Sequence, residues 1–65
     1  MSPSRVVVTY VFQGEGGAPM GPYSPGEAAG MVAILGHLGE MGVTVTRITT
    51  QYLPGGRSVR FRRVL

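Results

Sequence analysis

The sequence predicts a small α+β domain of order strand, helix, strand, strand: a three-stranded sheet with one helix packed on one face. Two observations carry this prediction. Three runs rich in β-branched and aromatic residues lie at 5–13, 43–52 and 58–64, and a segment with a helix start and helical periodicity separates the first run from the second. With 65 residues in all, the chain is expected to form one domain over 1–65, with an antiparallel or mixed sheet.

The first strand is predicted over residues 5–13, RVVVTYVFQ. Alternation gives it one apolar face, made of Val6, Val8, Tyr10 and Phe12. The other face is only half polar and carries Arg5, Val7, Thr9, Val11 and Gln13. Because valines remain on this second face, we expect it to be partly covered as well.

Residues 14–23 are rich in glycine and proline and are expected to form a loop. Ser24, Pro25 and Glu27 then match the N-cap, N1 and N3 positions of a capping box, which predicts a helix over 25–41 that stops at Gly42. The inward face of that helix is expected to hold Ala28, Met31, Val32, Leu35 and Leu38, widened by Ile34 and Met41.

The opposite side of the helix is small rather than charged, and includes Gly30, Ala33 and Gly36. Each interior glycine costs about 1 kcal/mol relative to alanine, so a second helix packing closely across an oligomer interface is one explanation. A glycine-rich coding bias is the other.

The second and third strands, 43–52 and 58–64, are joined by a hairpin at residues 53–57. In the second strand Val43 and Val45 point one way and Ile48 and Tyr52 the other, and this change of phase near Arg47 predicts a bulge or a strong twist. In the third strand Val59 and Phe61 share one face, while the other face holds Arg60, Arg62 and Val64.

Size limits what this fold can do alone. A folded 6.9 kDa monomer exposes about 4,000 Å² and has a marginal core, and without cysteine no disulfide supports it. One helix covers one face, so the other face of the sheet stays open, with Ile48 as a further candidate on it. We therefore expect a homo-oligomer, with interface residues Val7, Val11, Val64, Gly30, Ala33 and Gly36.

The charge is positive, +3, and every basic residue is arginine. A cluster of arginines surrounds the predicted hairpin: Arg47, Arg57, Arg60, Arg62 and Arg63. Guanidinium groups suit carboxylates and phosphates, so this cluster is the candidate binding site for an acidic protein or for nucleic acid. The third interpretation is that these arginines have no partner and only keep an edge strand hydrated.

Several functions are disfavoured by what the sequence lacks. The loop Gly14-Glu15-Gly16-Gly17 lacks the lysine and the spacing of a P-loop, and its glutamate would repel a phosphate. His37, three residues before Glu40, is the one candidate acid–base group and is expected to be a surface histidine. We predict no catalytic residue, no metal site and no cofactor. We also expect no membrane segment and a cytoplasmic location.

The prediction is therefore a non-enzymatic accessory protein that self-associates and docks an acidic protein partner through its arginine-rich hairpin. The alternative is a nucleic-acid-binding protein that uses the same hairpin.

Overall fold

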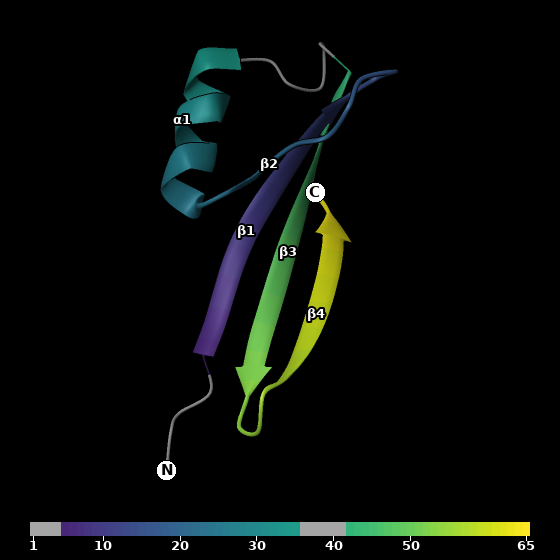
Figure 1. The fold of residues 1–65 in the computed structure, drawn as a ribbon. Helices are drawn as coiled ribbons and strands as arrows, with labels where there is room; N and C mark the ends of the chain where they lie inside the picture. The colour runs from purple at the N-terminus through teal and green to yellow at the C-terminus, as the bar shows by residue number, and fades with distance from the viewer. Residues whose placement is uncertain (1–4, 36–41) are drawn as a thin grey trace.

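The computed structural model describes residues 5–35 and 42–65, which form one antiparallel sheet and one helix (Figure 1). In chain order the elements are β1 (Arg5–Gly14), β2 (Met20–Tyr23), α1 (Pro25–Leu35), β3 (Val43–Leu53) and β4 (Arg57–Val64). The strands lie in the order β2-β1-β3-β4, so β1 and β3 are central and β2 and β4 are edges. The α+β class is thus confirmed, with one helix within residues 5–35 and 42–65.

The sheet has four strands, not the three expected, because residues 20–23 form β2 instead of part of a loop. β2 pairs with β1 through Tyr10–Tyr23 and Phe12–Met20, with a register shift between the two pairs. Its sequence, MGPY, is unlike a strand because a proline interrupts the ladder of hydrogen bonds. An edge strand accepts Pro22, whose missing N–H can face away from the sheet.

The pairing of β1 with β3 runs without a break from Arg5–Tyr52 to Gly14–Val43. The bulge expected near Arg47 is therefore wrong. Regular alternation alone puts Val43 and Val45 on the opposite face from Ile48 and Tyr52, since odd and even positions of a strand always point apart.

The register assigns every strand residue to one of two faces. We call the face that carries Phe12 the helix face, and the face that carries Val7, Thr9, Val11, Ile48 and Thr50 the open face. On β4, Val59, Phe61 and Arg63 belong to the helix face, while Ser58, Arg60, Arg62 and Val64 belong to the open face. The predicted split of β4 between an arginine side and an aromatic side follows this register.

The helix start is the capping box that the sequence predicts. The Ser24 N–H donates to Glu27 Oε1 at 3.1 Å, and the Glu27 N–H donates to Ser24 Oγ at 3.2 Å. The first helical turn closes with the Ala28 N–H bonded to the Ser24 carbonyl oxygen at 2.8 Å. Two amides that a helix leaves unpaired at its start are thus satisfied by side chains. The expected extension of the helix over residues 36–41 lies outside the described residues.

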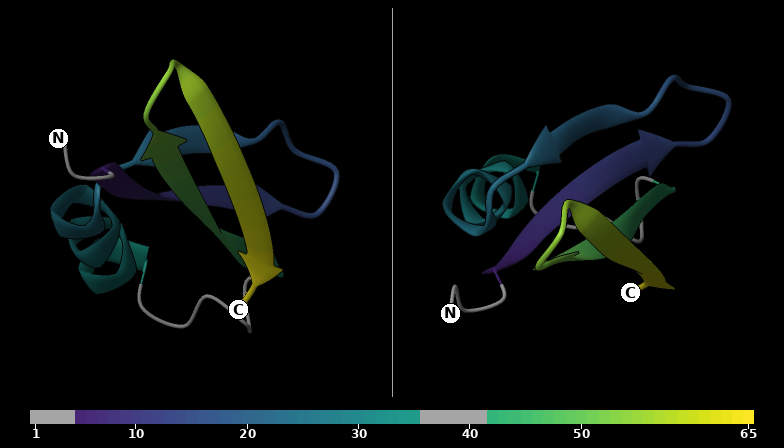
Figure 2. Two further views of the ribbon diagram at one scale, coloured as in Figure 1. Left: turned by 90° about the horizontal axis from the view of Figure 1, so that it is seen from below. Right: turned by 60° about the horizontal axis from the view of Figure 1, so that its bottom comes forward.

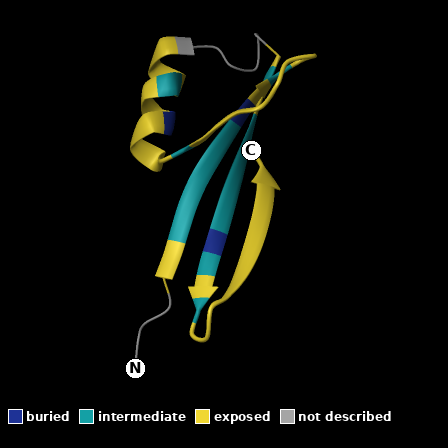
Figure 3. Cartoon of the chain, viewed as in Figure 1, coloured by how far each residue is buried: buried dark blue, intermediate teal, exposed yellow. Residues whose placement is uncertain are grey.

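The core of the described chain lies where α1 meets β1 and β2. Phe12 is fully buried, Ala28 is 6% exposed, and Tyr23 closes the cluster with its ring edge-on to Phe12 at 5.9 Å between centroids (Figure 3). Burial of a Phe side chain contributes roughly 1.5–3 kcal/mol. This small cluster is therefore the main apolar anchor of the helix.

The helix covers less of the sheet than expected, since it contacts β1 and β2 but neither β3 nor β4. Figure 2 shows α1 beside the part of the sheet formed by β1 and β2, away from the edge formed by β4. Val32 is 45% exposed and Ile34 is 81% exposed, so the inward apolar face predicted for the helix is only partly used. On the uncovered half of the helix face, Phe61 is 58% exposed.

The molecule is more extended than a folded monomer of its length. Its radius of gyration is 14.0 Å, where about 11 Å is usual for 65 residues. Its accessible surface is 4868 Å², where about 4,000 Å² is usual. The excess, roughly 900 Å², measures apolar and polar surface that an isolated chain leaves uncovered. Within the described ranges, no helix has the length and hydropathy needed to cross a membrane.

Candidate binding surface

The arginine-rich strand β4 is an edge strand, and all of its residues are exposed (Figure 3). Its eight residues pair with β3 in an unbroken register from Leu53–Arg57 to Thr46–Val64. The two acidic side chains in the described part of the chain lie elsewhere: Glu27 at the helix cap and Glu15 in the turn after β1. Positive charge therefore dominates this edge.

The structure divides the five predicted binding arginines between two faces. Arg60 and Arg62 lie on the open face, opposite Thr50 and Ile48. Arg47 and Arg63 lie on the helix face and stand directly opposite each other. Arg57 begins β4 opposite Leu53. A single flat ligand therefore contacts two or three of these side chains, not all five.

The open face is hollowed along its middle by two adjoining depressions of ≈ 330 Å³ and ≈ 300 Å³. Val11 and Ile48 line both, so they form a common apolar floor. Arg60 and Arg62 line the β4 side, one in each depression. The opposite side is lined by two prolines, Pro22 of β2 and Pro19 just before it. We call this feature the open-face groove.

Tyr52 lines one end of the groove and pairs with Arg5, a contact that was not predicted from the sequence. Arg5 and Tyr52 are register partners, and the Arg5 guanidinium carbon lies 5.9 Å from the centroid of the Tyr52 ring. Near them Thr50 is 9% exposed on the open face, which is deep for a polar residue. No buried side-chain nitrogen or oxygen in the described ranges lacks a hydrogen-bond partner.

One hydrogen bond just after β4 shows which residues of β4 direct their backbone groups at β3 and which direct them at the free edge. The Leu65 N–H donates to the Val45 carbonyl oxygen at 2.9 Å, and the register of β4 continues to the pair Val45–Leu65. Bonded and non-bonded pairs alternate in an antiparallel ladder, so Arg63, Phe61, Val59 and Arg57 direct their backbone groups at β3. The residues between them direct their N–H and C=O groups to the free edge: Ser58, Arg60, Arg62 and Val64.

The predicted oligomer interface residues do not form one surface. Val7 and Val11 line the open-face groove and Val64 lies on the same face, 66% exposed. Gly30 and Ala33 are exposed on α1, which packs on the other side of the sheet, and a Cβ added at Gly30 would meet nothing within 4 Å. Gly36 lies outside the described residues. The open-face residues are thus the connected part of this set.

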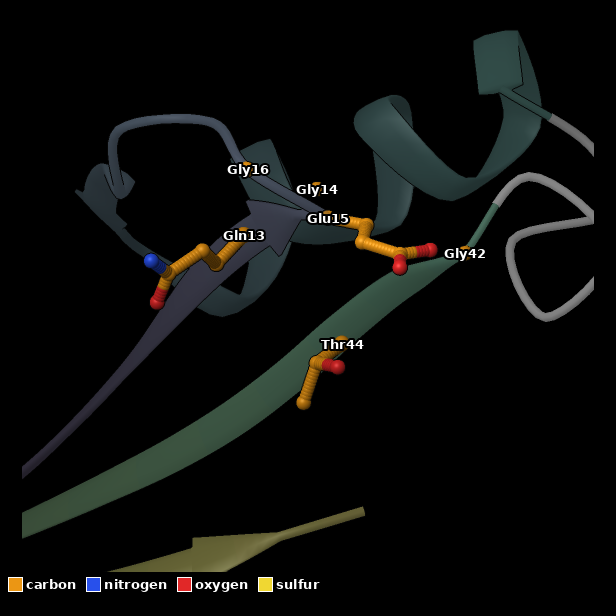
Figure 4. A pocket seen from close by; sticks show the side chains of 6 residues that line it. All are labelled: Gln13, Gly14, Glu15, Gly16, Gly42 and Thr44. Atoms are coloured by element: carbon orange, nitrogen blue, oxygen red, sulfur yellow. The ribbon is translucent and has the colours of Figure 1, made fainter.

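The glycine-rich turn after β1 is a shallow hollow lined by residues 13–16 together with Gly42 and Thr44 (Figure 4). Glu15 reaches from the turn toward Gly42, whereas Gln13 points the other way and donates a hydrogen bond to the Gly17 carbonyl oxygen at 3.1 Å. β2 separates this turn from the helix start, where Ser24 and Glu27 already satisfy free amides. The arrangement therefore differs from a P-loop, in which a glycine-rich turn leads directly into a helix N-terminus.

The described part of the chain holds no group of three or more potential metal ligands. His37 and Glu40, the candidate acid–base pair, lie outside the described residues. The hydrogen bonds from the Ser24 backbone and hydroxyl lower the pKa of Glu27 below its ordinary 4.5.

Sequence reasoning missed β2, and with it the proline side of the groove. Met20, Gly21 and Pro22 resemble a loop, and their pairing with β1 depends on a glycine at φ 119°. Comparisons with protein-family models, with curated proteins and with solved structures found no match to this chain.

Proposed function

We propose that this protein is a non-enzymatic, self-associating binding module that docks an acidic protein segment through its arginine-rich hairpin. The observation that supports it best is the placement of β4: an exposed edge strand with arginines on both faces, and no acidic side chain in β4 or in its neighbour β3. Guanidinium groups pair with carboxylates in charge-assisted, often bidentate hydrogen bonds.

Self-association is supported by area. The excess surface of roughly 900 Å² is close to the ~800 Å² that each partner contributes to a standard interface. The open-face groove offers an apolar floor of Val7, Val11 and Ile48 for it. We propose a second copy as the occupant of this groove.

A two-fold arrangement keeps the arginines of the two copies apart. Two sheets packed face to face run nearly aligned. If the two-fold axis runs along the strands between them, β4 of one copy stacks over β2 of the other, because the strand order is reversed in the rotated copy. Arg60 and Arg62 then lie near the partner's proline side, at the rim of the interface, where they remain hydrated.

A second candidate function is nucleic-acid binding on the other face. Arg47 and Arg63 stand opposite each other, on the same face as the exposed ring of Phe61. Paired guanidinium groups beside an exposed ring are what a phosphate and a stacked base require. This candidate uses residues different from those of the open face, so the two functions are separable by mutation.

The test is fluorescence anisotropy with three labelled probes at matched ionic strength: a glutamate-rich peptide, single-stranded DNA and single-stranded RNA. The Arg60→Ser/Arg62→Ser variant is compared with Arg47→Ser/Arg63→Ser, which removes the same charge from the other face. We expect the peptide to bind, and the first variant to weaken it by about tenfold or more, since two charge-assisted pairs are lost.

The other outcomes are equally specific. If the oligonucleotides bind and Arg47→Ser/Arg63→Ser lowers the salt slope by roughly 2, the nucleic-acid function replaces the proposed one. If no probe binds, the arginines only solvate the β4 edge and the proposed function is wrong.

A further inference from the structure

The backbone of β4 gives the proposed acidic partner a defined shape, and this inference rests on the proposed function. At the free edge, Ser58, Arg60, Arg62 and Val64 present N–H and C=O groups in the spacing of a strand. The side chains of these four residues all lie on the open face. Along a strand the side chain and the backbone N–H and C=O groups both reverse direction at every residue, so every second residue shares both directions. Two of the four carry a positive charge.

We infer that the partner binds as an extended segment that adds a fifth strand to the β4 edge, with acidic residues at every second position. In an added strand, the residues opposite Arg60 and Arg62 lie on the open face beside the guanidinium groups. Carboxylates at those two places are two residues apart in the partner. Backbone hydrogen bonds then provide affinity and the alternating acids provide the register.

Charge argues against a second copy at this edge. In an antiparallel β4–β4 pairing centred on Arg60, Arg57 faces Arg63, and in one centred on Phe61, Arg60 faces Arg62. Like charges directly opposite are destabilising, and each chain already carries +3. The same arginines that oppose self-pairing favour a strand of opposite charge, so the edge selects a different partner from the groove.

The length and regularity of β4 fit this role. Natural edge strands avoid pairing by being short, bulged, interrupted by proline or charged, and of these devices charge alone still admits a strand of opposite sign. β2 follows that pattern, with four residues, a register shift and Pro22. β4 has eight residues, an unbroken register and no proline. Of the two edges, β4 is thus the one that accepts a strand.

The test uses two isomeric labelled nonapeptides built from glutamate, threonine and valine. In one the glutamates alternate with the other residues, and in the second they are contiguous. Four protein variants accompany the wild type. Ser58→Pro removes an outward N–H without touching a charge, and Ser58→Ala is its matched control. Arg62→Pro is compared with Arg62→Ala, so that both lack the charge and only the proline variant lacks the outward N–H. Circular dichroism confirms that each variant folds.

We expect the alternating peptide to bind about tenfold more tightly than its isomer, and Ser58→Pro to weaken it roughly 2- to 10-fold while Ser58→Ala does not. Amide hydrogen exchange at Ser58, Arg60 and Arg62 should slow on binding, whereas Val59, Phe61 and Arg63 are already protected in the free protein. Equal binding of both isomers, with no effect of Ser58→Pro, would overturn the added strand but leave the acidic partner standing. If neither peptide binds, the proposed function falls together with this inference.

Discussion

Arg47 of β3 and Arg63 of β4 are direct register partners on the helix face, so two arginine side chains leave neighbouring strands side by side. Like charges in this position oppose folding unless an anion lies between them or solvent screens them. Arg47 is half-buried and Arg63 is exposed. No acidic side chain of the described residues is a register partner of either arginine, so the pair lowers the stability of the fold wherever solvent does not screen it.

This pair yields a stability prediction. Arg63→Glu turns a like-charge pair into an opposite-charge pair, and we expect it to raise the free energy of unfolding by about 0.2–1 kcal/mol. Urea denaturation at low and high salt measures it, and the gain should shrink as salt rises. Arg57→Glu, opposite Leu53 instead of an arginine, is the matched control. A gain at Arg57 equal to that at Arg63 would show that net charge alone is responsible.

The second prediction concerns the small core. Phe12 is fully buried against Tyr23, and Phe12→Ala should lower the free energy of unfolding by about 3–5 kcal/mol, from lost burial and the cavity left behind. Phe61→Ala is the contrasting change, because Phe61 is 58% exposed. Chemical denaturation of both variants should show a much larger loss of unfolding free energy for Phe12→Ala than for Phe61→Ala. Similar losses would mean that Phe61 is buried in solution, against a partner copy.

The third prediction uses the capping box. Ser24→Ala removes the N-cap acceptor and should destabilise the protein by about 0.5–2 kcal/mol. Because the hydrogen bonds from Ser24 lower the Glu27 pKa, this carboxylate stabilises the fold above its ordinary pKa of 4.5, and that stability is lost as the pH falls through the lower folded value.

Glu27→Gln tests the pH dependence directly. Thermal unfolding of wild type and Glu27→Gln between about pH 6 and pH 3 should show a difference that fades toward the acid end. A difference that persists unchanged at the lowest pH would mean that the charge of Glu27 plays no part in the cap.

The fourth prediction concerns Gly21, which allows β2 to pair. Its φ is 119°, and a Cβ there would lie 2.8 Å from the Tyr10 carbonyl oxygen. Gly21→Ala should therefore detach β2 from β1 and expose the ring of Tyr23, which pairs with Tyr10. Tyrosine fluorescence quenching measures that exposure. Gly30→Ala, where the added Cβ meets nothing, should leave quenching unchanged and slightly stabilise the helix.

The sequence was sufficient for the elements with strong local rules. The alternating valines of β1 and the Ser24–Glu27 cap act within a few residues, and both are found in the structure. It was insufficient for β2, because only the contact with β1 makes a strand of residues 20–23. The split of the arginines between two faces was only partly visible. Alternation separates Arg60 from Arg63, but that Arg47 meets Arg63 depends on the β3–β4 register.

Which part of the sheet the helix covers could not be predicted from local sequence patterns either. The helical spacing of Val32 and Ile34 suggested burial, yet α1 lies at the β1–β2 side and leaves both largely exposed. Where a helix sits on a sheet is decided by which side chains fit beneath it. Here Phe12 and Tyr23 supply that fit at one side only.

The open-face groove gives a mutational test of self-association. Ile48→Glu places a charge on its apolar floor and should lower the native mass to that of one chain, because a buried unpaired charge is strongly unfavourable. Val6→Glu, on the helix face and 57% exposed, is the control that should leave the mass unchanged. If Val6→Glu dissociates the protein and Ile48→Glu does not, the copies meet through the other face.

The most direct test of the account is the native mass of the wild-type protein by light scattering over a concentration series, with the absorbance spectrum recorded across the same peak. A dimer that meets through the open-face groove has a mass of twice 6.9 kDa, and we expect a protein spectrum alone across its peak. A mass of 6.9 kDa at every concentration would contradict this dimer, because the open-face groove would then have no second copy to cover it.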